Sequence, residues 1–299
     1  MGKTLLIGHH GVSWRDWLKE HRGNRDLLCL DPAESYAGPP ARFVLVRGNR
    51  PVYHRFYGSL DAQRAPHVMM ASLAQALFVA EEDALIQLFP YRPFPLLRQI
   101  VALIAQLVQP SAILVAQGTA LDLDGFPVGP EEVELGKSFP LLVMQAQRKA
   151  QWMKLMEQCQ EHDVDLRQVT IEGARFGSGE NLTREVEGVL YAERCGSTLL
   201  MVSDEELSDA QIARALDSSH TARAHLVSPE AYRNLLCSFG RPNGEDFGMG
   251  TVAEIDWESL RARVLCTAIP PAPVRILRLG SLRIDPHGNE LGEAKPWQV

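Results

Sequence analysis

The stretch Lys3-Thr-Leu-Leu-Ile-Gly-His-His-Gly-Val-Ser-Trp-Arg15 decides the fold of this chain. Lys3 to Gly8 is a short apolar run that ends in glycine, as a buried strand does. Ser13 to His21 follows with apolar residues at helical spacing. The order of strand, tight loop and helix predicts that the chain opens with the first unit of an α/β fold.

Short apolar runs and helical patterns alternate along the rest of the first part of the chain. We expect further strands at 27–30, 112–116, 139–144 and 166–171, helices at 68–82, 96–108 and 147–159, and a hairpin at 42–56 around Gly48-Asn49. Short strands separated by helices favour a mainly parallel sheet with helices on both faces. We therefore expect one α/β domain over residues 1–192.

The pattern changes after Gly196. Runs with period-two alternation are separated by glycine, proline and asparagine, and one helix is expected at 209–216. The sequence therefore predicts a smaller β-rich domain over residues 197–299.

Composition excludes several classes of protein. The formal net charge of −7 argues against a protein whose whole surface binds nucleic acid, although a local basic groove stays open. The most apolar stretch, Pro95 to Ala116, is interrupted by Arg98 and Pro110, which makes it too short to span a bilayer. We expect no secretory signal and no membrane segment.

The cysteines indicate a reducing compartment. They are far apart in the sequence, without a close pair of metal-ligand spacing: Cys29, Cys159, Cys195, Cys237 and Cys266. We interpret them as reduced thiols of a cytoplasmic protein.

The loop after the first strand fits a phosphate-binding motif only in part. Against the pattern G-x-x-x-x-G-K-[ST], Gly8 fits, but Ser13 stands for the second glycine, Trp14 for the lysine and Arg15 for the hydroxyl residue that holds magnesium. In such loops backbone N–H groups and a helix N-terminus hold phosphates, and the lysine bridges the terminal ones. By the pattern alone, this loop does not match.

Two interpretations of the loop stay open. Ser13 and Asp16 have the spacing of a capping box, which would explain these residues without a ligand. The alternative is an anion or nucleotide site formed by Gly8, Gly11, Ser13 and Arg15 through backbone N–H groups and the guanidinium.

Two further sets of residues have both a functional and a structural interpretation. Asp122 and Asp124 lie two apart beside a turn glycine, where they either bind magnesium or form a solvated turn. Trp14, Trp17 and Trp152 lie at helical positions, and we expect them in the core rather than as platforms for stacked bases.

Several segments resemble the polynucleotide 5′-hydroxyl kinase family of RNA processing. Leu27-Leu-Cys-Leu-Asp31, followed by Gly38-Pro39-Pro40, looks like the family's second strand, which ends in an acidic D-x-D-x-G-Q segment before a glycine-proline-proline turn. The other similar segments are Arg55-Phe-Tyr-Gly58-Ser59, Ala112 to Gln117 with Gly125-Phe126 and Gly129, Arg175-Phe-Gly-Ser178 with Arg184-Glu185 and Tyr191, Phe247 to Asp256, and Leu279 to Asp285.

The resemblance implies a P-loop-NTPase-like α/β fold with a small β domain at its end, and it suggests roles for single residues. Arg175 and Arg184 correspond to a lid whose arginines reach across the transferring phosphate. The alternative is that they lie at an exposed helix start beside a glutamate and bind no anion. Asp31, at the carboxyl end of a strand, either acts as a base or binds a metal-bound water, or it only caps the turn before Pro32. We expect any anion site at the Gly8 to Arg15 loop, facing the two arginines; no metal ligands are assigned.

Three departures from the family fall on catalytic parts. Trp14 replaces the lysine, the second acidic residue and the Gly-Gln pair are missing after Asp31, and Asn181 stands at one lid arginine. Lysine and magnesium neutralise charge in phosphoryl transfer, so their loss should remove ordinary kinase activity.

We therefore expect a catalytically degenerate relative, a pseudoenzyme that binds or scaffolds RNA or a protein complex. The alternative is an active RNA 5′-hydroxyl kinase that uses ATP or GTP with Mg and replaces the lysine by Arg15 and backbone groups.

Overall fold

The computed structural model describes residues 2–34, 36–121, 126, 128–241, 246–267 and 276–294. The chain divides into two compact units, Met1–Gln151 and Trp152–Val299. This division lies earlier in the chain than the boundary that the sequence predicts at 192–197. The reason is that two strands before residue 192 pair with strands near the C-terminus. They are β8 (Gln160–Asp165), which pairs with β16 (Arg261–Cys266), and β9 (Thr170–Glu172), which pairs with β17 (Ile276–Ile284).

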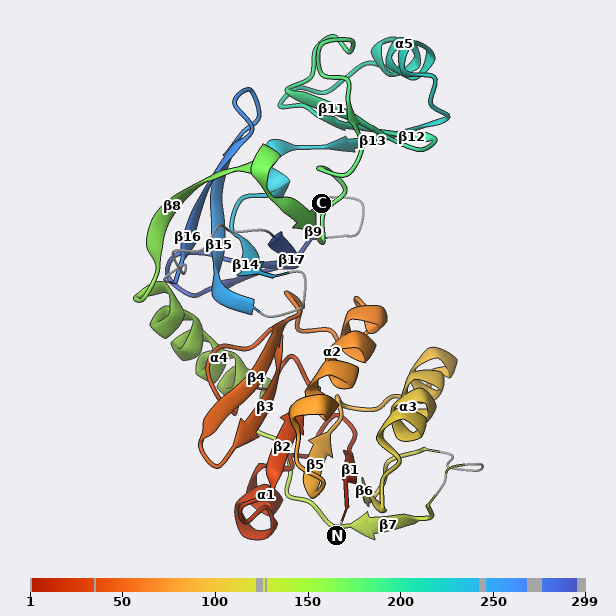
Figure 1. Ribbon diagram of the computed structural model, residues 1–299, viewed down its shortest axis with the longest axis vertical. Coiled ribbons are helices and arrows are strands. Elements are labelled where there is room, and N and C mark those ends of the chain that lie inside the picture. Colours follow the sequence, from red (N-terminus) through yellow and green to blue (C-terminus); the bar gives the residue numbers. More distant parts are fainter. Residues whose placement is uncertain are drawn as a thin grey trace. The chain divides into compact units, whose positions relative to one another are not determined.

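The first unit is built on a seven-stranded sheet in the order β4-β3-β2-β5-β1-β6-β7 (Figure 1). Its strands are β1 (Thr4–Ile7), β2 (Asp26–Cys29), β3 (Arg42–Arg47), β4 (Arg50–Phe56), β5 (Ala84–Gln87), β6 (Ala112–Ala116) and β7 (Pro130–Val133). Its helices are α1 (Arg15–His21), α2 (Pro66–Val79), α3 (Pro95–Val108) and α4 (Leu141–Met156), the last of which continues into the second unit. Five strands run parallel and β3-β4 form an antiparallel hairpin at one edge, which confirms the predicted mainly parallel sheet.

Helices cover both faces of this sheet because alternate strand residues point to opposite sides. Leu5 and Ile7 of β1 belong to the core cluster that contains the buried residues of α2 and α3. Leu6, between them, belongs to a second cluster with Trp14 and with Leu18 of α1. The alternation within one short strand therefore builds a three-layer unit.

The strand predicted at 139–144 is wrong. Leu141, Leu142 and Val143 are exposed in the first turn of α4, and the Met144 N–H donates to the Pro140 carbonyl oxygen at 3.1 Å. A short apolar run has no period that separates a strand from a helix, and proline is favourable just before a helix begins. The strand predicted at 166–171 is also shorter, a 3-10 turn (Leu166–Gln168) followed by β9.

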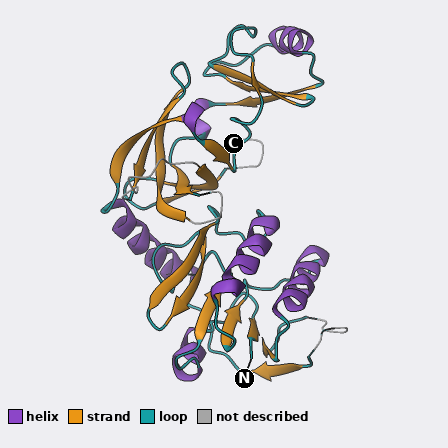
Figure 2. Cartoon of the chain, in the orientation of Figure 1, coloured by secondary structure: helices purple, strands orange, loops and turns teal. Residues whose placement is uncertain are grey.

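The second unit is rich in β-structure, as predicted (Figure 2). It contains a four-stranded sheet β10-β11-β12-β13 and a sheet in the order β18-β17-β14-β15-β16-β8, with β9 beside β17. The remaining elements are β10 (Glu180–Asn181), β11 (Tyr191–Cys195), β12 (Thr198–Val202), α5 (Asp209–Ser219), β13 (Arg223–Val227), a 3-10 turn (Pro229–Ala231), β14 (Leu235–Gly240), β15 (Asp246–Asp256) and β18 (Glu290–Glu293). Within the described parts of both units, no helix combines the length and the apolar character needed to cross a membrane.

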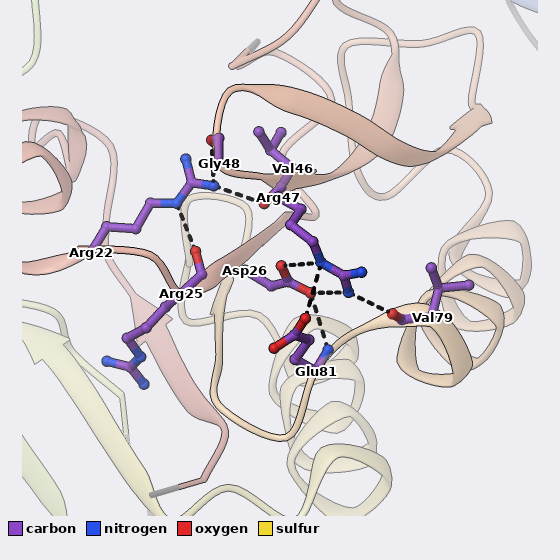
Figure 3. A network of polar contacts seen from close by, with 8 residues as sticks. All are labelled: Arg22, Arg25, Asp26, Val46, Arg47, Gly48, Val79 and Glu81. Carbon is purple, nitrogen blue, oxygen red and sulfur yellow. Dashed lines mark hydrogen bonds and ion pairs between the residues drawn. The ribbon is translucent and has the colours of Figure 1, made fainter.

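A buried carboxylate fastens the edge hairpin of the first unit to its sheet (Figure 3). Asp26 begins β2, its side chain is 1% exposed, and it accepts hydrogen bonds from Arg47 Nε at 3.0 Å and Nη2 at 2.9 Å. The Glu81 N–H donates to the same carboxylate at 3.0 Å, and Arg47 also donates to the Val79 carbonyl oxygen. The hydrogen bonds from Arg47 hold the pKa of Asp26 below its ordinary value. This network joins β2, β3 and the end of α2.

We expect Asp26→Ala to lower the free energy of unfolding by about 2 kcal/mol, because it removes charge-assisted hydrogen bonds and leaves the Glu81 N–H without an acceptor. Urea unfolding at pH 7 measures the change. The exposed Glu20 of α1 provides the control, since Glu20→Ala should stay within about 0.5 kcal/mol of the unaltered protein. Equal effects of the two substitutions would contradict a structural role of the Asp26 network.

Candidate functional site

The loop that follows β1 borders a cleft at the carboxyl ends of the parallel strands, where open α/β sheets bind their ligands. The cleft has a volume of about 540 Å³ including the solvent at its mouth. It is lined by Gly8, His9, His10, Gly11, Val12, Ser13, Trp14, Asp31, Glu34, Gln87, Leu88, Pro90, Ser138 and Met144. The structure therefore brings Asp31 together with the predicted loop residues Gly8, Gly11 and Ser13.

The N–H groups of Val12, Ser13 and Arg15 in this loop are engaged by the protein itself. The Ser13 N–H donates to the Gly136 carbonyl oxygen at 3.1 Å, and the Arg15 N–H to Ser13 Oγ at 3.3 Å. The Val12 N–H faces the His9 carbonyl oxygen at 3.5 Å. A phosphate-binding loop turns successive N–H groups toward the ligand, so these bonds remove donors that a phosphate would need.

The capping box predicted for Ser13 and Asp16 is not formed. Helix α1 begins at Arg15 with Trp14 at the N-cap, and no side chain caps it. Asp16 instead pairs with Lys19 at 2.7 Å, one turn further along the helix. A side-chain cap therefore does not explain the loop sequence.

Trp14 occupies the motif position of the lysine and is part of the core, as predicted. Its side chain is 4% exposed and packs in the cluster with Leu6 and Leu18. A Cβ atom at Gly8 would lie 3.0 Å from the indole Nε1, so the ring lies directly against the backbone of the loop. Nε1 has no hydrogen-bond partner among the described residues. Trp152, 0% exposed, is also in the core, whereas Trp17 is half-buried and stacks on His21.

Arg15 is committed to an ion pair. Its Nε and Nη2 atoms both donate to Glu34 Oε2, at 2.9 and 2.6 Å. Its guanidinium also lies over the Tyr36 ring, 5.7 Å from the ring centroid. Arg15 must leave Glu34 before it can take the place of the missing lysine.

Asp31 combines features of both of its interpretations. The carboxylate is buried at 5% exposure and accepts a hydrogen bond from the Ala33 N–H at 3.0 Å, as a turn cap does. Burial first, and then the nearby Glu34, raise the pKa of Asp31 to about 7. A carboxyl group with that pKa, in a cleft, has the properties of a general base at neutral pH.

The two predicted lid arginines belong to the second unit. Arg175 lies between β9 and β10 and Arg184 follows β10, and both side chains are exposed. Their role opposite the loop stays a prediction. Asp122 and Asp124 lie outside the described residues. In the described ranges, no group of three or more His, Cys, Asp or Glu side chains could hold a metal ion.

Sequence reasoning missed two residues of the cleft. Gln87, 4% exposed, accepts a hydrogen bond from the Tyr36 hydroxyl at 2.6 Å. A polar residue at the end of the apolar run Ala84–Gln87 is a signal that could have identified it. Glu34 gives no comparable signal, because its ion pair with Arg15 joins residues 19 positions apart.

Comparisons with known proteins agree with the family resemblance. No family model matches the chain. The polyribonucleotide 5′-hydroxyl-kinase of Methanocaldococcus jannaschii is 22% identical over 171 residues, 53% of this chain and 45% of that protein. The chain thus spans less than half the length of the curated relative that it matches. The match confirms the resemblance to polynucleotide 5′-hydroxyl kinases that the sequence suggested.

Solved structures support the fold. A chain of the structure described as wild-type Clp1p–Pcf11p complex matches with a TM-score of 0.56 at 10% identity, covering 94% of this chain and 74% of its own. A chain of a second Clp1p–Pcf11p structure, which concerns ATP loss in a Gly135Arg point mutant, matches with a TM-score of 0.54 at 10% identity, covering 94% and 75%. These likenesses establish the P-loop-like α/β fold with its C-terminal β domain.

We expect stability to depend on the ionisation of Asp31. Its pKa of about 7 in the folded protein lies above the ordinary 3.8, so the folded protein holds this proton more tightly than the unfolded chain and loses stability as the pH rises from about 4 to about 7. The side chain introduced by Asp31→Asn would stay neutral throughout. The Asp31→Asn protein should therefore exceed the unaltered one in unfolding free energy by on the order of 3 kcal/mol at pH 8, and by less than about half of that at pH 5, where only part of the difference in ionisation has developed.

Urea unfolding at both pH values measures this difference. Asp163→Asn, at an exposed position of β8, controls for the loss of one negative charge. The difference in unfolding free energy between Asp31→Asn and the unaltered protein could instead be the same at pH 5 and pH 8. That result would show that Asp31 has an ordinary pKa.

Proposed function

We propose that this protein is a catalytically degenerate relative of polynucleotide 5′-hydroxyl kinases, acting in RNA processing as a binding or scaffold protein. The observation that carries the proposal is the buried Trp14 indole, which lies against Gly8 at the position of the phosphate-binding lysine. An indole N–H cannot neutralise the charge of a triphosphate. The site therefore lacks the cation on which phosphoryl transfer by this fold depends.

Three further contacts support the loss of chemistry. Glu34 neutralises Arg15, which is the cation nearest in sequence to the lost lysine. Ser13 and Val12 direct their N–H groups to protein carbonyl oxygens. Each electrostatic contribution to such a transition state is worth several kcal/mol, so their joint absence is incompatible with ordinary turnover.

The comparisons favour a protein partner within this proposal. The two solved structures named above are complexes of Clp1p with a second protein, Pcf11p. The net charge of −7 also disfavours broad contact with RNA phosphates, although RNA bound in a local groove stays compatible with it.

One observation favours the alternative function, an ATP- or GTP-dependent RNA 5′-hydroxyl kinase that works with Mg. Asp31 lies in the cleft with a pKa of about 7, as a base that accepts a proton from a hydroxyl group requires. In that case Arg15 must exchange Glu34 for a phosphate. Glu34→Gln would then release Arg15 and strengthen nucleotide binding.

We expect the unaltered protein to transfer no radiolabelled phosphate from ATP or GTP to an RNA 5′-hydroxyl above background. Mg-ATP at about 1 mM should leave its melting temperature unchanged, because a ligand stabilises only in proportion to its binding to the folded state. Glu34→Gln should change neither result. Two results would favour the alternative over the proposal. One is robust phosphate transfer by the unaltered protein, and the other is a rise in melting temperature with Mg-ATP that is larger for Glu34→Gln than for the unaltered protein.

A further inference from the structure

The lining of the cleft at the loop lacks the positive side chains of a nucleotide site. Among the described residues that line it are the carboxyl groups of Asp31 and Glu34 and no lysine or arginine. Glu34 is already paired with Arg15, so Asp31 is the carboxyl group that can receive an incoming cation. His10 adds no positive charge at neutral pH, because burial and the nearby Arg92 lower its pKa. Phosphate groups in this cleft would meet carboxylates, whereas an ammonium or guanidinium group would find acceptors.

An exposed apolar run borders the same cleft. Ser138 and Met144 line the cleft, and the residues between them in the chain are accessible. Phe139 is 50% exposed, Leu141 66% and Leu142 79%. Consecutive exposed side chains of this size beside a hollow are typical of a surface that another protein covers.

We propose that the cleft and the run Phe139–Val143 together bind a segment of a partner protein that carries an arginine beside apolar side chains. This inference rests on the proposed function, since it needs a cleft without nucleotide. The guanidinium enters beside Asp31, where its planar fork can pair with a carboxylate, and the flanking apolar side chains cover Phe139, Leu141 and Leu142. The net charge of −7 adds a general attraction for a basic partner.

The surroundings of Asp31 explain why a cation would be held there. Asp31 is desolvated, and Glu34 of the same loop opposes its ionisation. The positive charge of Arg148 in α4 acts on it, and Cys29 of β2 and Tyr36 also lie within electrostatic reach. A bound guanidinium would supply the missing compensation. Since it favours the ionised carboxylate, its affinity should rise as the pH increases through about 7.

The inference can be tested with two peptides and a protein of the sequence Met1–Val299. The probe is acetyl-Leu-Phe-Arg-Leu-Leu-amide, and the matched control replaces its arginine by citrulline, which has nearly the same shape and no charge. Calorimetric titration at pH 8 should show the arginine peptide binding at least about tenfold more tightly, as expected for a charge-assisted pair. At pH 6 the ratio of the two affinities should be less than about half of its value at pH 8.

Variants locate the effect. Asp31→Asn should reduce the preference for arginine to about twofold or less, whereas Asp163→Asn, in the second unit, should leave it unchanged. Leu142→Ser should weaken the binding of both peptides equally, because Leu142 contacts only their apolar side chains. If Asp31→Asn does not fold, the pH comparison on the unaltered protein decides.

The outcomes separate this inference from the proposed function. Equal affinity for the two peptides at pH 8, or a preference that Asp31→Asn retains, overturns the inference. Absence of binding by both the arginine peptide and Mg-ATP overturns it while leaving the proposed function intact. Mg-ATP that binds and displaces the arginine peptide overturns both.

Discussion

The contact between the Trp14 indole and the backbone at Gly8 is the constraint on which the first unit's site depends. In a phosphate-binding loop, glycines allow the backbone to approach the phosphate closely. Here the space beneath the loop belongs to the core cluster of Leu6 and Leu18. The loop is consequently held by two contacts: the Trp14 indole packs against its backbone at Gly8, and its Ser13 N–H donates to the Gly136 carbonyl oxygen.

The sheet of the first unit has the arrangement in which open α/β folds bind ligands beyond the carboxyl ends of their strands. Its parallel strands still deliver Asp31, Gln87 and the loop to one edge, and they still leave a cleft there. The described lining of that cleft contains no lysine or arginine. A fold can therefore preserve the position of a site without the residues that a particular reaction needs, which is why fold likeness alone does not establish activity.

The sequence predicts features that are local and fails on those that depend on distant partners. The apolar run after Lys3 and its glycine predict β1 and the loop, and the hairpin follows from Gly48-Asn49, because short-range periodicity and turn residues determine these elements. The helix over Leu141–Met156 was missed at its start, since its apolar residues face solvent instead of the core. Within the site, the buried Trp14 was predictable from its helical spacing. The pairing of Arg15 with Glu34 was not, because no sequence pattern encodes it.

Helix α4 places the division of the chain in an unusual position. The division, at Gln151 and Trp152, falls within a continuous helix and not in a loop. Domain boundaries usually fall in exposed linkers, which proteases cut and which tolerate truncation. A cut here would instead break helical hydrogen bonds and leave Trp152, whose Nε1 donates to Glu290 at 3.1 Å, at a frayed chain end. A fragment that keeps only the second unit would therefore need the preceding turns of α4 to hold its largest buried side chain in place.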